Sequence, residues 1–257
     1  LGPALAACSA GSARAEVTAS DAALLRSTLT PVGADRAGNA DGSIPAWTGG
    51  YTMAPAGYVD GGKRADPFAA DRPLFVITAE NWRRYADQLP EGQKALFEKY
   101  RDYRMVVYPT HRSAAAPASV YEAIFANATR ARQTGNGVQG AAGGIPFPIP
   151  HTGLEAVWNH LLAFWGAARE DGIQNYFIPE GGTPELTNEY REIVDFPYYY
   201  PGATPDSFGK YYLKRREISV TPAQFAGRGY LQWQAIDPDR DAMQAWQYVP
   251  HESRVRK

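Results

Sequence analysis

The sequence predicts an α+β fold, in which a helical and irregular first part is followed by an antiparallel sheet. Three observations lead to this prediction. Apolar residues recur at helical spacing in several segments before residue 170, and they alternate with polar residues in several segments after it. The later segments are separated by short turns rich in Pro, Gly and Asp, as is typical of antiparallel hairpins. The two patterns follow one another along the chain, which is the order expected of an α+β protein.

The composition excludes several classes of protein. The 257 residues include 26 Lys plus Arg and 27 Asp plus Glu, so the formal net charge is -1. A chain so nearly balanced lacks the basic excess of a nucleic-acid-binding protein. Its single Cys, Cys8, can form neither an intramolecular disulfide nor a Cys-cluster metal site. With 44% hydrophobic residues the chain can bury a substantial core, so we expect a globular protein. We expect neither a cofactor nor a metal.

Residues 1–15 resemble the remnant of a secretory signal peptide, because they are rich in Ala and carry a single charge. Two kinds of processing are open. Cleavage after Ala15 would release a mature chain at Glu16 and would remove Cys8. Residues 5–8 (LAAC) instead resemble a lipobox, in which Cys8 would be acylated and would anchor the protein to a membrane. We favour cleavage because the site directly precedes the first capped helix; a plain Ala-rich terminus would leave the compartment open.

We expect residues 16–257 to form a single domain with three parts. Residues 33–71 are rich in Gly, Pro, Ala and Asp and show no period, so they predict an extended arm that lies over another surface. Residues 72–170 hold most of the predicted helices, and residues 171–257 hold the predicted antiparallel strands. The last strand stops at Lys257 without a turn, which suggests that the domain is truncated at its C-terminus.

Four helices are predicted from capping residues and apolar spacing. Ser20 and Thr78 can each cap a helix through the side-chain hydroxyl, and Pro90 can occupy a first turn. The predicted helices cover residues 20–29, 79–89, 90–100 and 117–132.

The clearest helix is predicted over residues 152–166. Thr152 and Glu155 have the spacing of a capping box, and Gly166 can end the helix. Apolar residues recur between them at helical spacing: Leu154, Val157, Trp158, Leu161, Leu162 and Trp165. We therefore expect a buried stripe with two Trp that packs against a broad apolar surface, the sheet.

Five strands are predicted after this helix from their content of Tyr, Trp, Ile and Val. They cover residues 173–178, 191–200, 208–220, 229–236 and 242–249. In the fourth strand Leu231, Trp233 and Ala235 share one face, and the turn at residues 237–241 joins it to the fifth strand as a hairpin. Consecutive hairpins build a meander or an up-and-down half-barrel. Since aromatic residues lie on both faces, a face can either line an apolar cavity or be covered by protein.

Two features of the sequence contain residue types found in functional sites, but the neighbouring sequence does not support such a site. Gly135-x-Gly137-x-x-Gly140 matches the dinucleotide fingerprint, but a helix is predicted before it and Pro146 follows it, whereas the fingerprint needs a strand before and a helix after. We interpret it as a Gly-rich loop. His111 would need a carboxylate partner for catalysis, and the sequence does not identify one. A structural turn is therefore favoured, and no catalytic residue is predicted.

Several segments of the sequence indicate a known family. They are residues 38–50 (GNADGSIPAWTGG), 67–68 (PF) with 73–75 (PLF), 107–112 (VYPTHR), 144–150 (GIPFPIP) and 153–161 (GLEAVWNHL). Together they resemble the DUF1329 family of bacterial envelope proteins, described as outer membrane lipoprotein-sorting-like proteins related to LolA and LolB. The chains of that family continue past the point where Lys257 stands, in agreement with the expected truncation.

The resemblance implies a periplasmic protein whose antiparallel sheet curves into an incomplete LolA/LolB-like half-barrel around a helix. Such a half-barrel would offer a hydrophobic cavity for a lipid or similar ligand. The resemblance also implies that the protein functions together with an RND-type transporter or an outer-membrane protein. It supplies no catalytic residues.

We therefore expect a non-enzymatic periplasmic carrier or chaperone that binds a lipid or other hydrophobic ligand. It would act in outer-membrane lipid or lipoprotein trafficking. Peripheral association with a membrane is compatible with this role. The cavity candidates are Trp165, Leu213, Ile218, Leu231, Trp233 and Trp246. An acyl chain gains about 0.8 kcal/mol per buried methylene, so binding needs no catalytic groups. Two alternatives are open: an interaction subunit of a cell-envelope complex, and a hydrolase that uses His111.

Overall fold

The computed structural model describes residues 17–59, 62–63 and 65–257. The expected signal-peptide remnant, residues 1–15 with Cys8, lies outside the described residues. The chain divides into two compact units. The larger unit holds Ala116–Lys257 together with the described residues before Asp35, and the smaller unit holds Asp35–Ala115.

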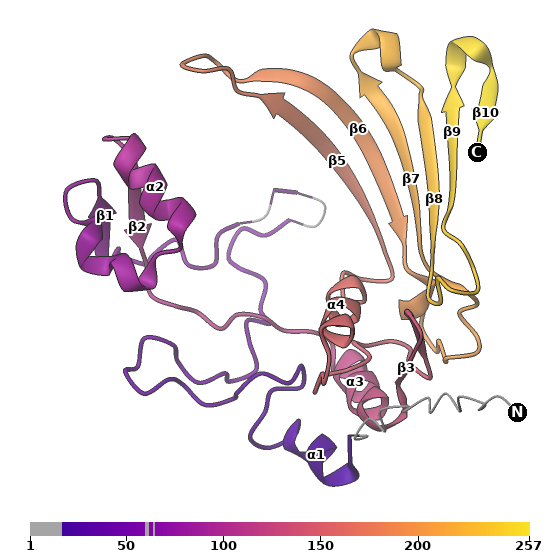
Figure 1. Ribbon diagram of the computed structural model, residues 1–257, viewed down its shortest axis with the longest axis horizontal. Helices are drawn as coiled ribbons and strands as arrows, with labels where there is room; N and C mark the ends of the chain where they lie inside the picture. The colour runs from indigo at the N-terminus through magenta and orange to yellow at the C-terminus, as the bar shows by residue number, and fades with distance from the viewer. Residues whose placement is uncertain (1–16, 60–61, 64) are drawn as a thin grey trace, which may run out of the picture. The chain divides into compact units, whose positions relative to one another are not determined.

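The larger unit is built around an open six-stranded antiparallel sheet (Figure 1). Its strand order is β10-β9-β8-β7-β6-β5, so each strand pairs with its neighbours in sequence. The strands are β5 (Ala168–Phe177), β6 (Glu185–Asp195), β7 (Tyr211–Thr221), β8 (Gly229–Ala235), β9 (Gln244–Val249) and β10 (Arg254–Arg256). The predicted α+β class and the antiparallel meander are thus confirmed.

The five predicted strands are present, but their ends differ from the prediction. β6 ends at Asp195, short of the predicted residue 200, because Pro197 lacks a ladder donor and Pro197–Tyr199 forms a 3-10 turn. β5 begins at Ala168, earlier than the predicted residue 173. The last strand does not run on to Lys257 as expected: Pro250–Glu252 forms a 3-10 turn, and a sixth strand, β10, follows the left-handed residue Ser253 (φ 43°) and pairs back onto β9.

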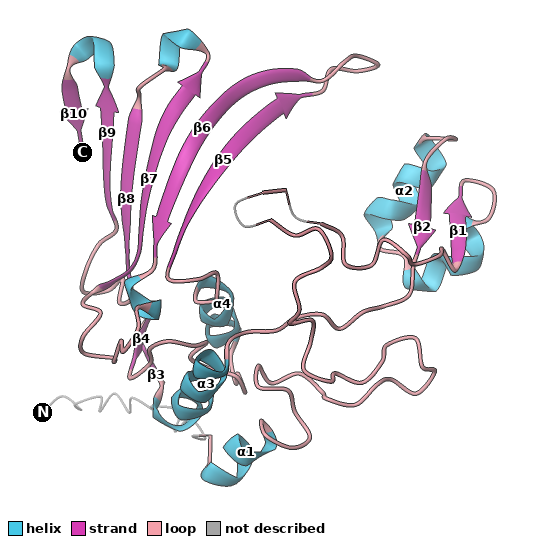
Figure 2. Ribbon diagram, turned by 180° about the vertical axis from the view of Figure 1, so that it is seen from behind, coloured by secondary structure: helices cyan, strands magenta, loops and turns pink. Residues whose placement is uncertain are grey.

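Helices α3 (Ala118–Arg130) and α4 (Gly153–Leu161) form the main core with one end of this sheet (Figure 2). Trp158 of α4 meets Tyr212 of β7 edge to face, with the ring centroids 5.8 Å apart. The core contains apolar side chains from both helices, the intervening segment, β6, β7 and the turn after β6: Val120, Ile124, Val138, Phe147, Trp158, Leu162, Val194, Phe196, Tyr198 and Tyr212. The predicted packing of the Trp158 helix on the sheet is confirmed.

The predicted length and buried stripe of this helix are partly wrong. Val157 and Leu161 of the stripe are 51% and 41% exposed, since the described residues do not cover this side of the helix. α4 stops at Leu161 rather than Gly166, and the N–H of Ala163 bonds to the carbonyl of His160, a tighter turn than an α-helix makes. The chain then leaves the helical path, so Trp165 is 63% exposed instead of buried. Near its start the Thr152 hydroxyl accepts from the Glu155 N–H as predicted.

Helix α1 (Ala19–Leu24) is shorter than the predicted helix over residues 20–29 and is capped by a different residue. Thr18, and not Ser20, accepts the Asp21 N–H, and the Asp21 carboxylate accepts the Thr18 N–H in return. This reciprocal pair satisfies two backbone donors, which a cap at Ser20 would not. Ala22 and Leu25 pack against Ala128 of α3.

Buried polar groups hold the Gly-rich segment between α3 and α4. The fully buried Asn127 donates to the carbonyls of Ala142 at 3.2 Å and Gly144 at 2.9 Å. The hydroxyl of Tyr198 donates to the same Gly144 carbonyl at 2.7 Å. A Cβ at position 144 would lie 2.6 Å from Cγ1 of Ile124, so glycine permits this close approach to α3.

The smaller unit contains a two-stranded antiparallel sheet that was not predicted. β1 (Phe75–Thr78) pairs antiparallel with β2 (Arg104–Val107), and α2 (Glu91–Lys99) lies between them in sequence. The predicted helix over residues 79–89 is instead a 3-10 helix, Trp82–Gln88. Its start is delayed because Thr78 ends β1 and its N–H donates to the Asn81 side chain. The core of this unit is Ile77, Trp82, Leu89 and Phe97.

Residues 36–59 of the predicted arm form no helix or strand, and they are bonded to a distant segment of the same unit. The Arg112 guanidinium donates to the carbonyls of residues 35–37. The Trp47 indole donates to the carbonyl of Ala114 at 3.0 Å. The backbone of this part of the arm is thus satisfied by side-chain and irregular backbone bonds rather than by a ladder.

Candidate functional site

The six-stranded sheet has two chemically different faces. Residues paired across an antiparallel ladder project to the same side, and successive residues of a strand project to opposite sides. Leu231 pairs with Trp246, whereas the next residue, Gln232, pairs with Arg215 and projects the other way. We call the first side the aromatic face; it carries Lys214, Arg216, Ile218, Leu231, Trp233, Trp246 and Tyr248. The opposite side, the polar face, carries Arg169, Glu192, Arg215, Glu217, Tyr230 and Gln232.

Three rings on the aromatic face pack against one another. The centroids of Trp233 and Trp246 are 5.1 Å apart with the ring planes at 70°, and Tyr211 lies 5.3 Å from Trp233. This near-perpendicular geometry is favourable for aromatic pairs and fixes the rings. All three are partly exposed, and none belongs to a core cluster of the described residues. An ordered apolar surface of this kind is typical of a binding site.

The structure brings four of the six predicted cavity residues onto this face: Ile218, Leu231, Trp233 and Trp246. Leu213 projects to the opposite side, because it stands five residues before Ile218 in the same strand and side chains alternate, and it packs against the main core. Trp165 follows α4, where the guanidinium carbon of Arg169, a residue of the polar face, lies 5.5 Å from its ring centroid. A shared cavity that includes all six residues is therefore not formed by the sheet alone.

Cations accompany the rings of the aromatic face. Nζ of Lys214 lies 5.4 Å from the Trp233 ring centroid, and Nζ of Lys257 lies 5.5 Å from that of Trp246. Arg216, on the same face, is exposed. Aromatic rings with adjacent cations suit a ligand that has an apolar body and an anionic group.

Glu192 is the centre of a charge network on the polar face. Its side chain is only 6% exposed, and its two oxygens lie 3.6 Å from Nη2 of Arg169 and 3.6 Å from Nη1 of Arg215. Arg215 also donates to Gln232 at 2.8 Å, and its Nε lies 3.3 Å from Oε1 of Glu217. Because a buried carboxylate is costly without partners, these side chains depend on one another.

The pKa of Glu217 reflects its place at the margin of this network. Burial raises the pKa of this carboxyl above its ordinary value, the nearby Glu192 adds to the rise, and Arg215 opposes it. Burial also raises the pKa of Tyr190, with further contributions from the two carboxylates. The charged form of Glu217 is therefore less favourable in the folded protein than in water.

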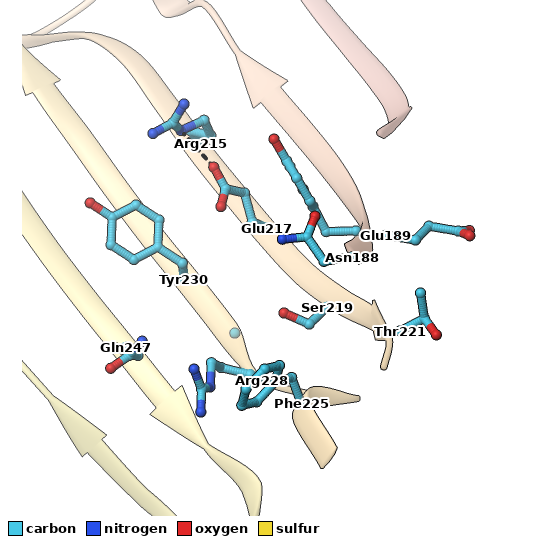
Figure 3. Close-up of a pocket in the computed structure, with 12 residues that line it drawn as sticks. Asn188, Glu189, Arg215, Glu217, Ser219, Thr221, Phe225, Arg228, Tyr230 and Gln247 are labelled. Carbon is cyan, nitrogen blue, oxygen red and sulfur yellow. Dashed lines mark ion pairs between the residues drawn. The ribbon is translucent and has the colours of Figure 1, made fainter. Parts of the chain in front are cut away.

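A cavity of about 530 Å³ opens beside this network (Figure 3). Its lining comes from β6 to β9 and the segment after β7, and most of it is polar. None of the six predicted cavity residues is among the residues that line it. No pattern in the sequence indicates this cavity, because its side chains come from four strands and are brought together only by the register of the sheet.

The smaller unit supplies the carboxylate partner that the sequence did not identify for His111. Nε2 of His111 lies 2.6 Å from Oδ2 of Asp71, and the ring of Phe68 stacks on the imidazole with centroids 3.9 Å apart. Such a carboxylate can orient an imidazole for base catalysis or simply hold it in place. The imidazole is partly exposed.

The dinucleotide-like motif forms a short hairpin, where the sequence was interpreted as a plain Gly-rich loop. β3 (Arg132–Thr134) and β4 (Gly137–Gln139) pair antiparallel around a turn at Gly135 and Asn136. The Asn136 N–H donates to the Asp239 carboxylate at 2.7 Å, which ties this turn to the loop between β8 and β9.

The described residues offer neither a metal site nor a membrane span. Among them, no group of three or more His, Cys, Asp or Glu is placed to hold a metal ion. No helix within the described ranges is long and apolar enough to cross a bilayer.

Comparison with known proteins gives a family but not an activity. The family model described as "Protein of unknown function (DUF1329)" matches residues 76–257. A protein of Pseudomonas aeruginosa, Uncharacterized protein PA3922, is 38% identical over 256 residues, which cover 95% of this chain and 54% of the relative. The chain thus spans about half the length of that curated relative. No solved structure matches this chain.

Proposed function

The chain belongs to the DUF1329 family, and from that premise we propose that it is a non-enzymatic carrier or chaperone for a lipid or other hydrophobic ligand. The aromatic face is the observation that carries this proposal. Trp233 and Trp246 present ordered, partly exposed rings beside Ile218 and Leu231. An acyl chain laid on this surface gains about 0.8 kcal/mol per methylene removed from water, so eight methylenes are worth roughly 6 kcal/mol.

The cations of the aromatic face favour an amphipathic ligand over a plain hydrocarbon. Lys214 lies beside Trp233, and Arg216 is on the same strand and the same face. An anionic headgroup at these side chains would leave the acyl chain on the rings, and the same arrangement would allow peripheral contact with an anionic membrane.

The location and partners of the carrier are further parts of the proposal. The start of the sequence supports secretion to the periplasm, with acylation of Cys8 as the alternative. The open antiparallel sheet is compatible with an incomplete LolA/LolB-like half-barrel, and outer-membrane lipid or lipoprotein trafficking beside an RND-type transporter or an outer-membrane protein would suit it.

Native mass spectrometry of the full-length protein, purified from the periplasmic fraction, tests the carrier function. We expect bound lipid that organic solvent extracts, and saturable binding of a fluorescent lysophospholipid to the delipidated protein. A lipid-free protein that also fails to bind the fluorescent probe would overturn the proposal.

Two other functions are alternatives to a carrier. An interaction subunit of an envelope complex would use the charged strand faces for stable docking, so in-cell cross-linking would capture a lasting partner rather than transient contacts.

A hydrolase is favoured by one observation, the Asp71–His111 pair. If His111→Gln and Asp71→Asn both abolished a measured esterase turnover while the circular dichroism spectrum was unchanged, the protein would be an enzyme. Unchanged turnover in both variants would favour a structural pair.

A further inference from the structure

The cavity on the polar face contains a cation that the rest of the protein does not neutralise. Arg228 lies one residue before β8 and lines the cavity. Among the described residues it forms no ion pair, and its buried Nε has no hydrogen-bond partner. A buried donor without a partner costs free energy, so such a group in a cavity indicates a missing ligand or solvent partner.

The second arginine of the cavity, Arg215, also has a buried Nε without a hydrogen bond, but it differs from Arg228 in having ion pairs. Arg215 lies near the carboxylates of Glu192 and Glu217 and donates to Gln232. Its charge is already matched within the sheet. Arg228 is therefore the lining cation whose charge is available to a ligand.

The guanidinium of Arg228 lies over an aromatic ring. Its carbon lies 4.5 Å from the ring centroid of Phe225, in the 3-10 turn Ala223–Phe225 that connects β7 to β8. A guanidinium that contacts an aromatic ring in this way keeps N–H groups that can donate to a ligand. A planar edge of N–H donors matches the oxygens of a carboxylate or a phosphate.

Neutral hydrogen-bonding groups surround this edge. Figure 3 shows the guanidinium of Arg228 between the side chains of Gln247 and Ser219, with Tyr230 lining the same hollow. The Glu189 carboxylate, also among the lining residues, points away from Arg228 in this view. The other lining carboxylate, Glu217, is paired with Arg215. The site thus combines one free cation with amide and hydroxyl groups that both donate and accept.

We propose that this cavity binds a small hydroxylated organic anion, whose phosphate or carboxylate group pairs with Arg228. The volume of about 530 Å³ exceeds the need of an inorganic ion and falls within the range of small-molecule sites. Ser219, Tyr230 and Gln247 bind the hydroxyl groups of the ligand. The same chemistry occurs in a soluble sugar or glycerol phosphate and in a lipid headgroup. This site lies on the opposite side of the sheet from the aromatic face and does not depend on the proposed carrier function.

Isothermal titration calorimetry of the purified protein with inorganic phosphate, glycerol 3-phosphate and a short-chain lysophosphatidic acid tests this proposal. We expect glycerol 3-phosphate or the lysolipid to bind more tightly than inorganic phosphate. Arg228→Gln should weaken that binding by about 10- to 100-fold, since it removes a charge-assisted pair. Arg228→Lys should lose less, because it keeps the charge without the planar edge. Arg240→Gln, a matched change of an exposed arginine in the loop between β8 and β9, should bind as the unsubstituted protein does.

The tightest probe identifies the source of the anion. Tighter binding of glycerol 3-phosphate indicates a soluble ligand, and tighter binding of the lysolipid indicates a headgroup; both support the site. The absence of binding for all three probes, or equal binding in Arg228→Gln, overturns it. Trp233→Ala separates this result from the carrier function, because it should leave glycerol 3-phosphate binding unchanged.

Discussion

The two faces of the six-stranded sheet are made by the same strands but use their side chains differently. On the polar face, Glu192 is buried between Arg169 and Arg215, so these charges are paired with one another across neighbouring strands. On the aromatic face, Trp233 and Trp246 contact each other but belong to no core cluster of the described residues. The comparison indicates that the charges of one face are paired within the sheet, whereas the apolar rings of the other face lie outside every core cluster of the described residues.

The comparison predicts its largest effect for Glu192→Ala. This change leaves Arg169 and Arg215 without their shared carboxylate, and we expect a loss of about 2–4 kcal/mol in the free energy of unfolding. The expected loss is at the lower part of the range for buried pairs because both arginines are about one-third exposed. Urea denaturation measures it.

Glu170→Ala is the matched control, since Glu170 lies on the neighbouring strand but projects from the aromatic face and is exposed. It should change the free energy of unfolding by less than about 0.5 kcal/mol. Equal losses in the two variants would mean that the polar face contributes no special stability.

The next effect concerns ligand binding by the aromatic face. Trp233→Ala removes the ring that contacts both Tyr211 and Trp246, and we expect the affinity for a fluorescent lysophospholipid to fall about tenfold or more. Trp165→Ala is the control, because this exposed ring lies outside the aromatic face. If the control loses as much affinity as Trp233→Ala, the ligand does not lie on the aromatic face.

A smaller effect is expected from the cation beside Trp233. Lys214→Gln should weaken binding of an anionic acyl probe by roughly two- to fivefold at low salt, since an exposed charge is worth about 1 kcal/mol or less. Added salt should shrink this difference, because screening weakens exposed charges. A neutral probe with the same acyl chain should bind Lys214→Gln and the unsubstituted protein equally; a loss for that probe would assign Lys214 a packing role instead.

The long strands could be predicted from the sequence, but the short ones could not. β5 to β9 each carry enough Tyr, Trp, Ile and Val to stand out, whereas β1, with four residues, and β10, with three, are too short to show a period. The helix over residues 152–166 was predicted too long because Trp165 continues the apolar spacing after the helix has ended at Leu161. Spacing alone does not mark where the backbone leaves the helical path.

Some parts of the candidate sites could likewise be predicted from the sequence, and others could not. Alternation along β8 separates Leu231 and Trp233 from Gln232, so part of the aromatic face was visible in the sequence. The partners of Glu192 were not, because the register that brings Arg169 and Arg215 to it cannot be read from one strand. The pairing of Asp71 with His111 likewise joins residues that only the tertiary structure brings together.

The smallest predicted effect concerns the pH dependence of the polar face. Because the pKa of Glu217 is raised in the folded protein, the folded state holds this proton more tightly than the unfolded state does. The contribution of Glu217 to stability is therefore greatest at low pH and falls as the pH rises from the unfolded pKa through the folded one. Glu217→Gln should remove this fall, so above about pH 5 the variant should be more stable by roughly 1 kcal/mol or less.

Thermal unfolding of both proteins from pH 4 to pH 8 measures this difference. The two curves should meet at the acidic end and separate as the pH rises, since the glutamine cannot ionise. Glu185→Gln, at an exposed position of β6, removes one carboxylate from the same sheet without touching the Glu192 network. If Glu217→Gln instead lost stability at neutral pH, the Arg215–Glu217 pair would outweigh the burial of the carboxyl, and the polar face would depend on two carboxylates rather than on Glu192 alone.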